Sequence, residues 1–183
     1  MLRPILTSRR LLAAALVLTA SLGVGHGRAY ADGQDVPEAA RDLAWGETLF
    51  YFFERDNFQA ITRLMVARQR AELTYHHEEA ELVLGGLYLD YGMHDHATRV
   101  FETLLASRAR PEIRDQAWYY LGRARYERGF NADALAALAK VGDRLPKNLR
   151  PEFIDLQART LLNLDRPAEA ASLLAKQDRK SVV

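Results

Sequence analysis

The histidines are the residues best suited to metal chemistry, and four of the five fall in two pairs. His76 and His77 are adjacent, and His94 and His96 are one residue apart. Carboxylates flank both pairs, at Glu78, Glu79, Asp90 and Asp95. Imidazole and carboxylate groups together can hold zinc. The segment between the pairs is predicted to be a helix about 21 Å long, which would place the pairs at opposite ends. We therefore expect solvated helix-end histidines and no metal site, although His94 and His96 alone could form a weak surface site.

Other catalytic arrangements have equally little support. After residue 31 the serines are Ser107, Ser172 and Ser181, and none lies in the strand–turn–helix context of a nucleophile elbow. The pair Gly85–Gly86 lies within a predicted helix, so it is not a phosphate-binding loop. There is no cysteine, which excludes thiol nucleophiles, disulfides and cysteine-ligated metals. We expect no enzymatic activity and no cofactor.

Composition and charge indicate a globular chain that does not bind nucleic acid. The 183 residues are 49% hydrophobic and 27% charged, with a formal net charge of +1. Residues 1–31 carry four arginines and no acidic residue, so the remainder has a net charge of −3. Nucleic-acid-binding domains usually carry a marked basic excess, so we expect no nucleic-acid partner.

Residues 1–31 are expected to be a secretory signal. Arg3, Arg9 and Arg10 precede an uncharged run of about 15 residues, and Ala29-Tyr30-Ala31 matches the small-x-small cleavage pattern. The run is shorter than the roughly 20 residues of a spanning helix, so a membrane anchor is the weaker alternative. The two adjacent arginines, Arg9 and Arg10, leave a twin-arginine route open. We expect cleavage after Ala31, no stable membrane insertion afterwards, and a periplasmic or secreted protein.

The rest of the chain repeats with a period of about 37 residues. Small residues recur at Ala60, Ala97, Ala134 and Ala170, with spacings of 37, 37 and 36. A large apolar residue follows each by four positions, namely Leu64, Phe101, Leu138 and Leu174. Apolar residues three and four apart predict two helices in each unit. We place the four units at about 38–73, 76–110, 112–147 and 148–177.

Small residues also mark the first helix of three units, at Gly85, Gly122 and Ala158. We expect them to face the recurring alanines, since small side chains let two helices pack closely. Gly129 is expected to end a helix in the left-handed conformation. Trp118 is expected in the core.

This pattern resembles the tetratricopeptide repeat, W-x₂-L-G-x₂-Y followed by A-x₃-F and P. The residues that carry the resemblance in the third unit are Trp118, Leu121, Gly122, Ala134 and Pro146, and in the second unit Leu84, Gly85, Tyr88, Ala97 and Phe101. The first unit keeps Tyr51 and Ala60, and the fourth keeps Ala158, Leu161 and Ala170. The resemblance implies an all-α fold, an α-solenoid of about four stacked helix-turn-helix repeats.

The resemblance also implies a concave groove lined by the first helix of each unit. The family's groove positions that we favour fall on Trp45, Leu49, Phe52, Leu82, Leu89, Tyr119, Arg123, Tyr126 and Arg159. The same mapping includes Phe53, Asp90, Glu127, Asp155 and Leu162. Because aromatic and arginine side chains dominate interaction hot spots, we expect an exported scaffold that binds a protein or peptide partner.

The last six residues, Asp178 to Val183, read DRKSVV. This hexapeptide matches the translation of a common sequencing-library adapter read into a stop. We expect residues 178–183 to be non-native and the native chain to continue, and a natural basic tail is the alternative. The chain could then be the N-terminal repeat module of a longer envelope-assembly or polysaccharide-export protein, or of an enzyme whose catalytic domain follows.

Overall fold

The structure is a computed structural model that describes residues 41–181 and the side chains of residues 41–176. Residues 41–181 form eight α-helices, one short 3-10 helix and no strand. The fold over this range is therefore all-α, as the sequence predicts. The expected signal, residues 1–31, lies outside the described residues. The described residues divide into two compact units, residues 41–84 and 85–181.

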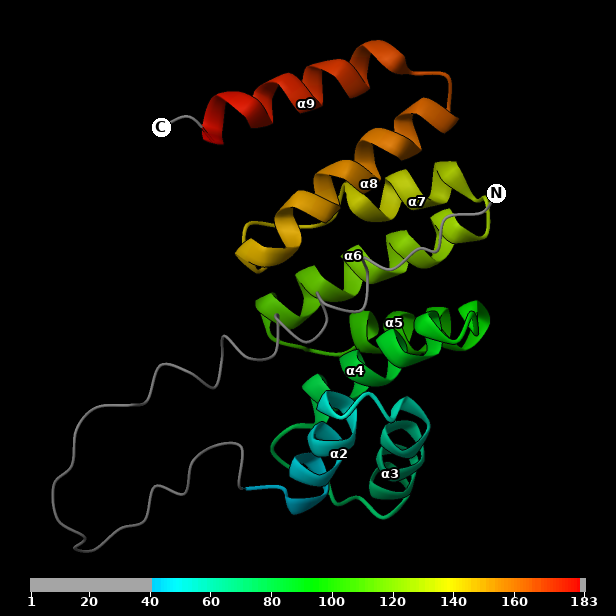
Figure 1. Ribbon diagram of the computed structural model, residues 1–183, viewed down its shortest axis with the longest axis vertical. Helices are drawn as coiled ribbons and strands as arrows, with labels where there is room; N and C mark the ends of the chain where they lie inside the picture. Colours follow the sequence, from blue (N-terminus) through cyan, green and yellow to red (C-terminus); the bar gives the residue numbers. More distant parts are fainter. Residues whose placement is uncertain (1–40, 182–183) are drawn as a thin grey trace, which may run out of the picture. The chain divides into compact units, whose positions relative to one another are not determined.

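The first unit contains α2 (Leu43–Phe53), α3 (Asn57–Gln69) and the start of α4 (His77–Asp90). Helices α2 and α3 pack as an antiparallel pair (Figure 1). Arg63 of α3 lies 2.9 Å from Glu47 of α2 and its guanidinium covers the Tyr51 ring. At the start of α2, the buried Asp42 carboxylate accepts hydrogen bonds from the backbone N–H groups of Tyr75 and His76. This carboxylate therefore fixes the segment that leads into α4.

The second unit continues with the rest of α4, five further α-helices and a short 3-10 helix, and each of these five α-helices packs on the next one along the chain (Figure 1). They are α5 (His94–Ala106), α6 (Pro111–Glu127), α7 (Asn131–Leu138), the 3-10 helix η2 (Lys147–Leu149), α8 (Arg150–Asn163) and α9 (Pro167–Ser181). Helix α6 also contacts α8 directly. Two helices therefore fall in each of the four repeat units that the sequence indicates.

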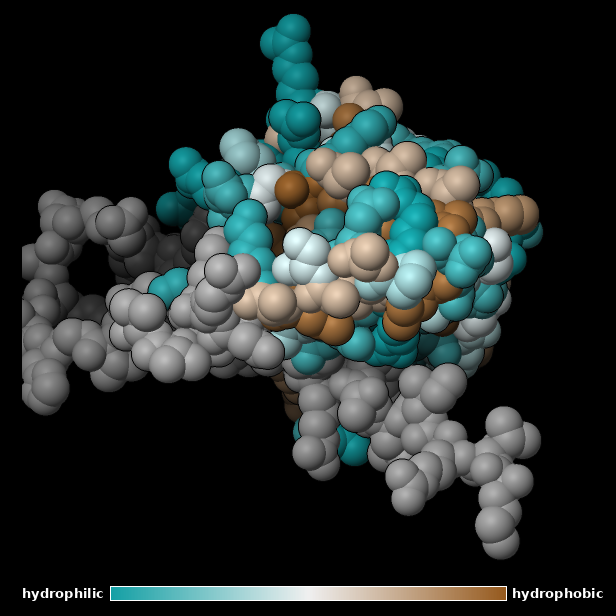
Figure 2. Space-filling view, turned by 90° about the horizontal axis from the view of Figure 1, so that it is seen from above, coloured by the Kyte–Doolittle hydropathy of each residue, from teal (hydrophilic) through white to brown (hydrophobic). Residues whose placement is uncertain are grey.

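The recurring alanines are the packing centres of the helix pairs. Ala60, Ala97 and Ala134 are fully buried, and Ala170 is 2% exposed. The large residues four positions later are buried in three units, but Leu174 is 44% exposed. Leu138 lies on α7, which packs against both α6 and α8. Among the described helices, α9 packs chiefly on α8, and Leu135 of α7 joins their shared core cluster. In the view from above (Figure 2), hydrophilic and apolar side chains are intermixed on the described surface.

The small residues in the first helices make room for large side chains. Two of them also lie near the recurring alanines as expected, since Gly122 is close to Ala134 and Ala158 shares a core cluster with Ala170. A Cβ atom placed on Gly85 would lie 2.4 Å from the Phe101 ring, and one on Gly122 would lie 2.6 Å from Leu138. The backbone oxygen of Ala134 lies 3.4 Å from the same Cβ position on Gly122. Each glycine is therefore required by the large residue of the A-x₃-F pattern.

The turn between the two helices of each pair has a left-handed residue. These residues are Arg55 (φ 63°), Gly92 (φ 70°), Gly129 (φ 81°) and Asp165 (φ 56°). Their positions follow the same spacings as the alanines. The left-handed conformation predicted for Gly129 is confirmed. At the equivalent position of the first pair, Arg55 adopts the same conformation, which its Cβ makes unfavourable.

Replacing Arg55 by glycine is expected to raise the free energy of unfolding by about 0.5–1 kcal/mol, because glycine adopts a positive φ without strain. Chemical denaturation followed by circular dichroism measures the change. Arg55→Ala is the control, since alanine keeps the Cβ and should give no gain. Equal stabilisation by both variants would show that the arginine side chain, not the backbone conformation, is unfavourable.

Candidate functional site

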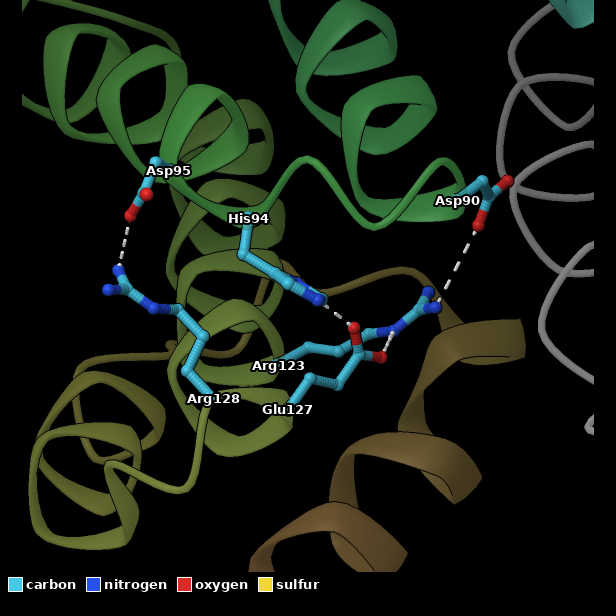
Figure 3. A network of polar contacts seen from close by, with 6 residues as sticks. All are labelled: Asp90, His94, Asp95, Arg123, Glu127 and Arg128. Atoms are coloured by element: carbon cyan, nitrogen blue, oxygen red, sulfur yellow. Dashed lines mark hydrogen bonds and ion pairs between the residues drawn. The ribbon is translucent and has the colours of Figure 1, made fainter.

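A polar cluster forms where α4 ends, α5 begins and α6 approaches its C-terminus. Gly92 turns the chain between Asp90, the last residue of α4, and His94, the first of α5. The side chains of both residues are directed toward α6 (Figure 3). Arg123 and Glu127 lie one turn apart on α6, so their side chains share one face of the helix. Because of this turn, Asp90 and His94 both reach residues of α6 that lie more than 30 positions further along the sequence.

Arg123 is the centre of this cluster. Its Nε donates a hydrogen bond to Glu127 Oε1 at 2.8 Å, and its Nη2 lies 3.8 Å from Asp90 Oδ1 (Figure 3). The Arg123 side chain is only 15% exposed. Burial lowers the pKa of the guanidinium, but the carboxylates of Glu127 and Asp90 raise it by more, so the pKa lies above its ordinary value. Arg123 is therefore a fixed cation with an oriented guanidinium plane.

Two further side chains extend the cluster. His94 Nδ1 lies 3.5 Å from Glu127 Oε2, which makes an ion pair when the imidazole is protonated. Arg128 pairs with Asp95 at 2.6 Å, which connects the end of α6 to the start of α5 (Figure 3). The Arg128 guanidinium also lies over the Phe130 ring, 4.8 Å from its centroid.

The face next to this cluster is shared by α6 and α8. The two helices are in direct contact, and the Phe153 ring of α8 packs on Tyr119 of α6 with a centroid distance of 6.4 Å. Burial raises the pKa of Tyr119 to about 12. We call this surface the α6/α8 face. Its residues are Arg123, Tyr126, Glu127, Asp155, Arg159 and Leu162.

The α6/α8 face presents both charges beside apolar groups. Arg159 pairs with Asp155 one turn away on α8, and their side chains are 59% and 53% exposed. Leu162 on the same helix is 55% exposed, and Tyr126 is partly exposed. Such a surface can donate and accept hydrogen bonds and also bury an apolar side chain, which are the contacts an extended peptide requires.

The structure divides the nine favoured groove residues by burial. Trp45, Phe52, Leu82, Leu89 and Tyr119 are buried, Leu49, Arg123 and Tyr126 are partly exposed, and Arg159 is exposed. Three residues of the wider mapping, Asp90, Arg123 and Glu127, meet in the polar cluster. His94 was not among the mapped positions, since nothing in its local sequence indicates that it lies near Glu127.

The burial of Trp45, Phe52, Leu82, Leu89 and Tyr119 corrects the expectation that these five side chains line an open groove. The expectation for Trp118 is corrected too. Tyr119 was expected in the groove but is 5% exposed, because the rings of Tyr120 and Phe153 pack on it at centroid distances of 4.9 and 6.4 Å. Trp118 was expected in the core but is only half-buried, and the Lys140 ammonium lies 4.3 Å from its ring centroid. The packing of α8 on this side of α6 accounts for the burial of Tyr119.

The histidine pairs lie at opposite ends of α4, as expected, because this helix spans 14 residues. His77 and His96 are exposed. His76 is not solvated, since it is 5% exposed and stacks on Trp45 with a centroid distance of 5.8 Å. Among the described side chains, no three His, Asp or Glu residues converge to hold a metal ion. Within residues 41–181, no helix combines the length and the apolar composition needed to cross a bilayer.

The sequence matches no protein-family model and no curated protein.

Proposed function

We propose that this chain is an exported repeat protein of the tetratricopeptide type, an α-solenoid that binds a peptide or a partner subunit through its first helices. The repeat supports the proposal in two independent ways. Buried alanines mark the second helix of every pair, and left-handed residues mark the turn before it, both with spacings of 37, 37 and 36. Stacked pairs bury apolar faces that a single pair leaves open.

The observation that carries the binding proposal is the α6/α8 face. The face combines an exposed and a partly exposed arginine with a partly exposed tyrosine, and these residue types are enriched in binding hot spots. Arg123 is held in place by two carboxylates, so a ligand would not have to order this side chain on binding. Export is supported by the basic, apolar and small-x-small order of residues 1–31, and the partner would then be an extracytoplasmic protein.

The test uses the purified protein and peptides selected from a random phage-displayed library, with affinities measured by isothermal titration calorimetry. The double variant Tyr126→Ala with Arg159→Ala should weaken binding at least tenfold, since hot-spot truncations cost about 2 kcal/mol. The matched control is Tyr91→Ala with Arg114→Ala, which removes exposed residues of the same types elsewhere in the second unit.

Tyr119 is left unchanged in this test because its burial means that truncation would leave a cavity. Arg123 is left unchanged because its loss would leave Asp90 and Glu127 without their shared cation. Helical circular dichroism should be the same for both double variants. Equal binding by both would contradict the assignment of the α6/α8 face, and so would a selection that yields no binding peptide.

A further inference from the structure

The first helix of the described chain has an apolar stripe on its outer side. The stripe consists of Leu43, Gly46, Phe50 and Phe53, spaced by three, four and three residues. Leu43 is 86% exposed, Phe50 60% and Phe53 47%. The buried side chains of α2 are Trp45, Thr48 and Phe52, which lie on the opposite side of the helix at 100° per residue. The α2 stripe shares no residue with the α6/α8 face.

The same positions in the later first helices are covered. The repeat spacing relates Leu43, Gly46 and Phe50 to three residues in each of α4, α6 and α8. Those residues are Ala80, Val83 and Leu87; Ala117, Tyr120 and Ala124; and Phe153, Leu156 and Thr160. Eight of the nine are buried, and Phe153 is partly buried. In the second unit, for example, the Phe101 ring of α5 covers Tyr120 of α6, with a distance of 5.7 Å between the ring centroids. These positions are therefore stacking positions, and α2 presents them to solvent.

We propose that a second copy of this chain covers the α2 stripe, with the two α2 helices packed antiparallel about a two-fold axis. The spacing of three, four and three residues is the same in both directions along the helix. In an antiparallel pair, each stripe residue therefore lies opposite a stripe residue of the second copy. Leu43 then lies beside the second copy's Phe53, and Phe50 lies over the second copy's Gly46. A large side chain over a glycine is the packing that this chain already uses at Gly122 and Leu138.

Charge favours the antiparallel orientation over the parallel one. Arg41 lies just before α2 and Glu54 just after it, and both are exposed. The Arg41 guanidinium lies over the Tyr75 ring, 5.5 Å from its centroid, so it does not face the stripe. An antiparallel pair places the two Glu54 carboxylates at opposite ends, whereas a parallel pair sets Glu54 against Glu54. The helix dipoles also oppose one another in the antiparallel pair, which is the favourable arrangement.

The exposed area indicates a weak dimer. The apolar side chains of the stripe offer about 400 Å² per copy, given that a fully exposed phenylalanine contributes about 200 Å². A symmetric pair with its flanking side chains would bury about 1,000 Å² in total, at the low end of specific interfaces. We therefore expect dissociation in the micromolar range.

Sedimentation velocity of the protein recovered from cells, with its N-terminus defined by mass spectrometry, tests the association. Between about 1 and 100 µM, a range that brackets the expected affinity, the protein should change from monomer to dimer. Phe50→Glu should weaken dimerisation at least tenfold. Phe58→Glu is the matched control, because Phe58 is 68% exposed but lies on α3, off the stripe. A monomer throughout this range, including one in which residues 1–40 cover the stripe, would overturn the proposal, and so would equal effects of the two variants.

The register is tested by disulfide formation, since the chain has no cysteine of its own. Leu43→Cys and Phe53→Cys proteins are oxidised separately and as a mixture. In the antiparallel pair, identical positions lie about 15 Å apart along the axis, which is too far for a disulfide. Cross-linked dimers should therefore form in the mixture and not in either protein alone. Cross-linking of either protein with itself, or none in the mixture, would overturn the antiparallel register.

Discussion

The Ala134→Glu variant is expected to lose about 4 kcal/mol of unfolding free energy, which combines overpacking with the burial of an unpaired charge. Ala134 has no exposed surface and lies on α7, which packs against both α6 and α8. Its backbone oxygen is already 3.4 Å from the position a Cβ would take on Gly122. A glutamate side chain would have to displace one of the neighbouring helices to reach solvent. Urea denaturation followed by circular dichroism measures the loss.

Ala136→Glu is the control for this change, because Ala136 is exposed on the same helix. Both variants add the same charge at similar helix positions, so helix propensity and net charge cancel in the comparison. The control should stay within about 0.5 kcal/mol of the parent, as expected for a surface substitution. A small loss for Ala134→Glu, comparable with that of the control, would mean that α7 does not pack in the orientation described.

The burial of Ala134 could be predicted from the sequence because a repeat averages out local ambiguity. Four alanines at a nearly constant spacing indicate one structural position, and all four are buried. Leu174 departs from its equivalents because burial at that position needs a helix on each side. The regular spacing also extends to Arg55, whose left-handed conformation no local signal indicates, since arginine is not a residue that favours it.

The candidate site was less predictable because it depends on contacts between distant residues. Trp118 and Tyr119 are adjacent on α6, and their side chains differ by about 100° around the helix. The repeat pattern alone assigns tryptophan to the core. In the structure Tyr119 is the more buried of the two, because the Phe153 ring on α8 packs against it. Trp118 lies nearer the surface, where the Lys140 ammonium lies over its ring. His94 joins the cluster through the turn at Gly92, and its distance from Glu127 depends on how α5 packs on α6.

Replacing Gly122 by leucine is expected to lower the free energy of unfolding by about 3 kcal/mol, at the upper end of overpacking costs. In an exposed helix the same change would stabilise by up to about 1 kcal/mol, because leucine is a much better helix former than glycine. Here a Cβ would lie 2.6 Å from Leu138 Cδ2, and Leu138 has no exposed surface into which it could move. The cost of overpacking therefore exceeds the gain in helix propensity, and the free energy of unfolding should fall.

The second substitution Leu138→Ala tests whether this contact is the cause. Alone it should cost about 3 kcal/mol, as a buried leucine truncation does. Combined with Gly122→Leu it exchanges the large and the small residue across α6 and α7, and total core volume is nearly conserved. The double variant should therefore be at least about 2 kcal/mol more stable than the sum of the two single losses predicts, a coupling expected only for residues in direct contact. Additive losses would show that α6 and α7 do not meet at these positions, and the large-over-glycine packing invoked for the α2 stripe would lose its precedent.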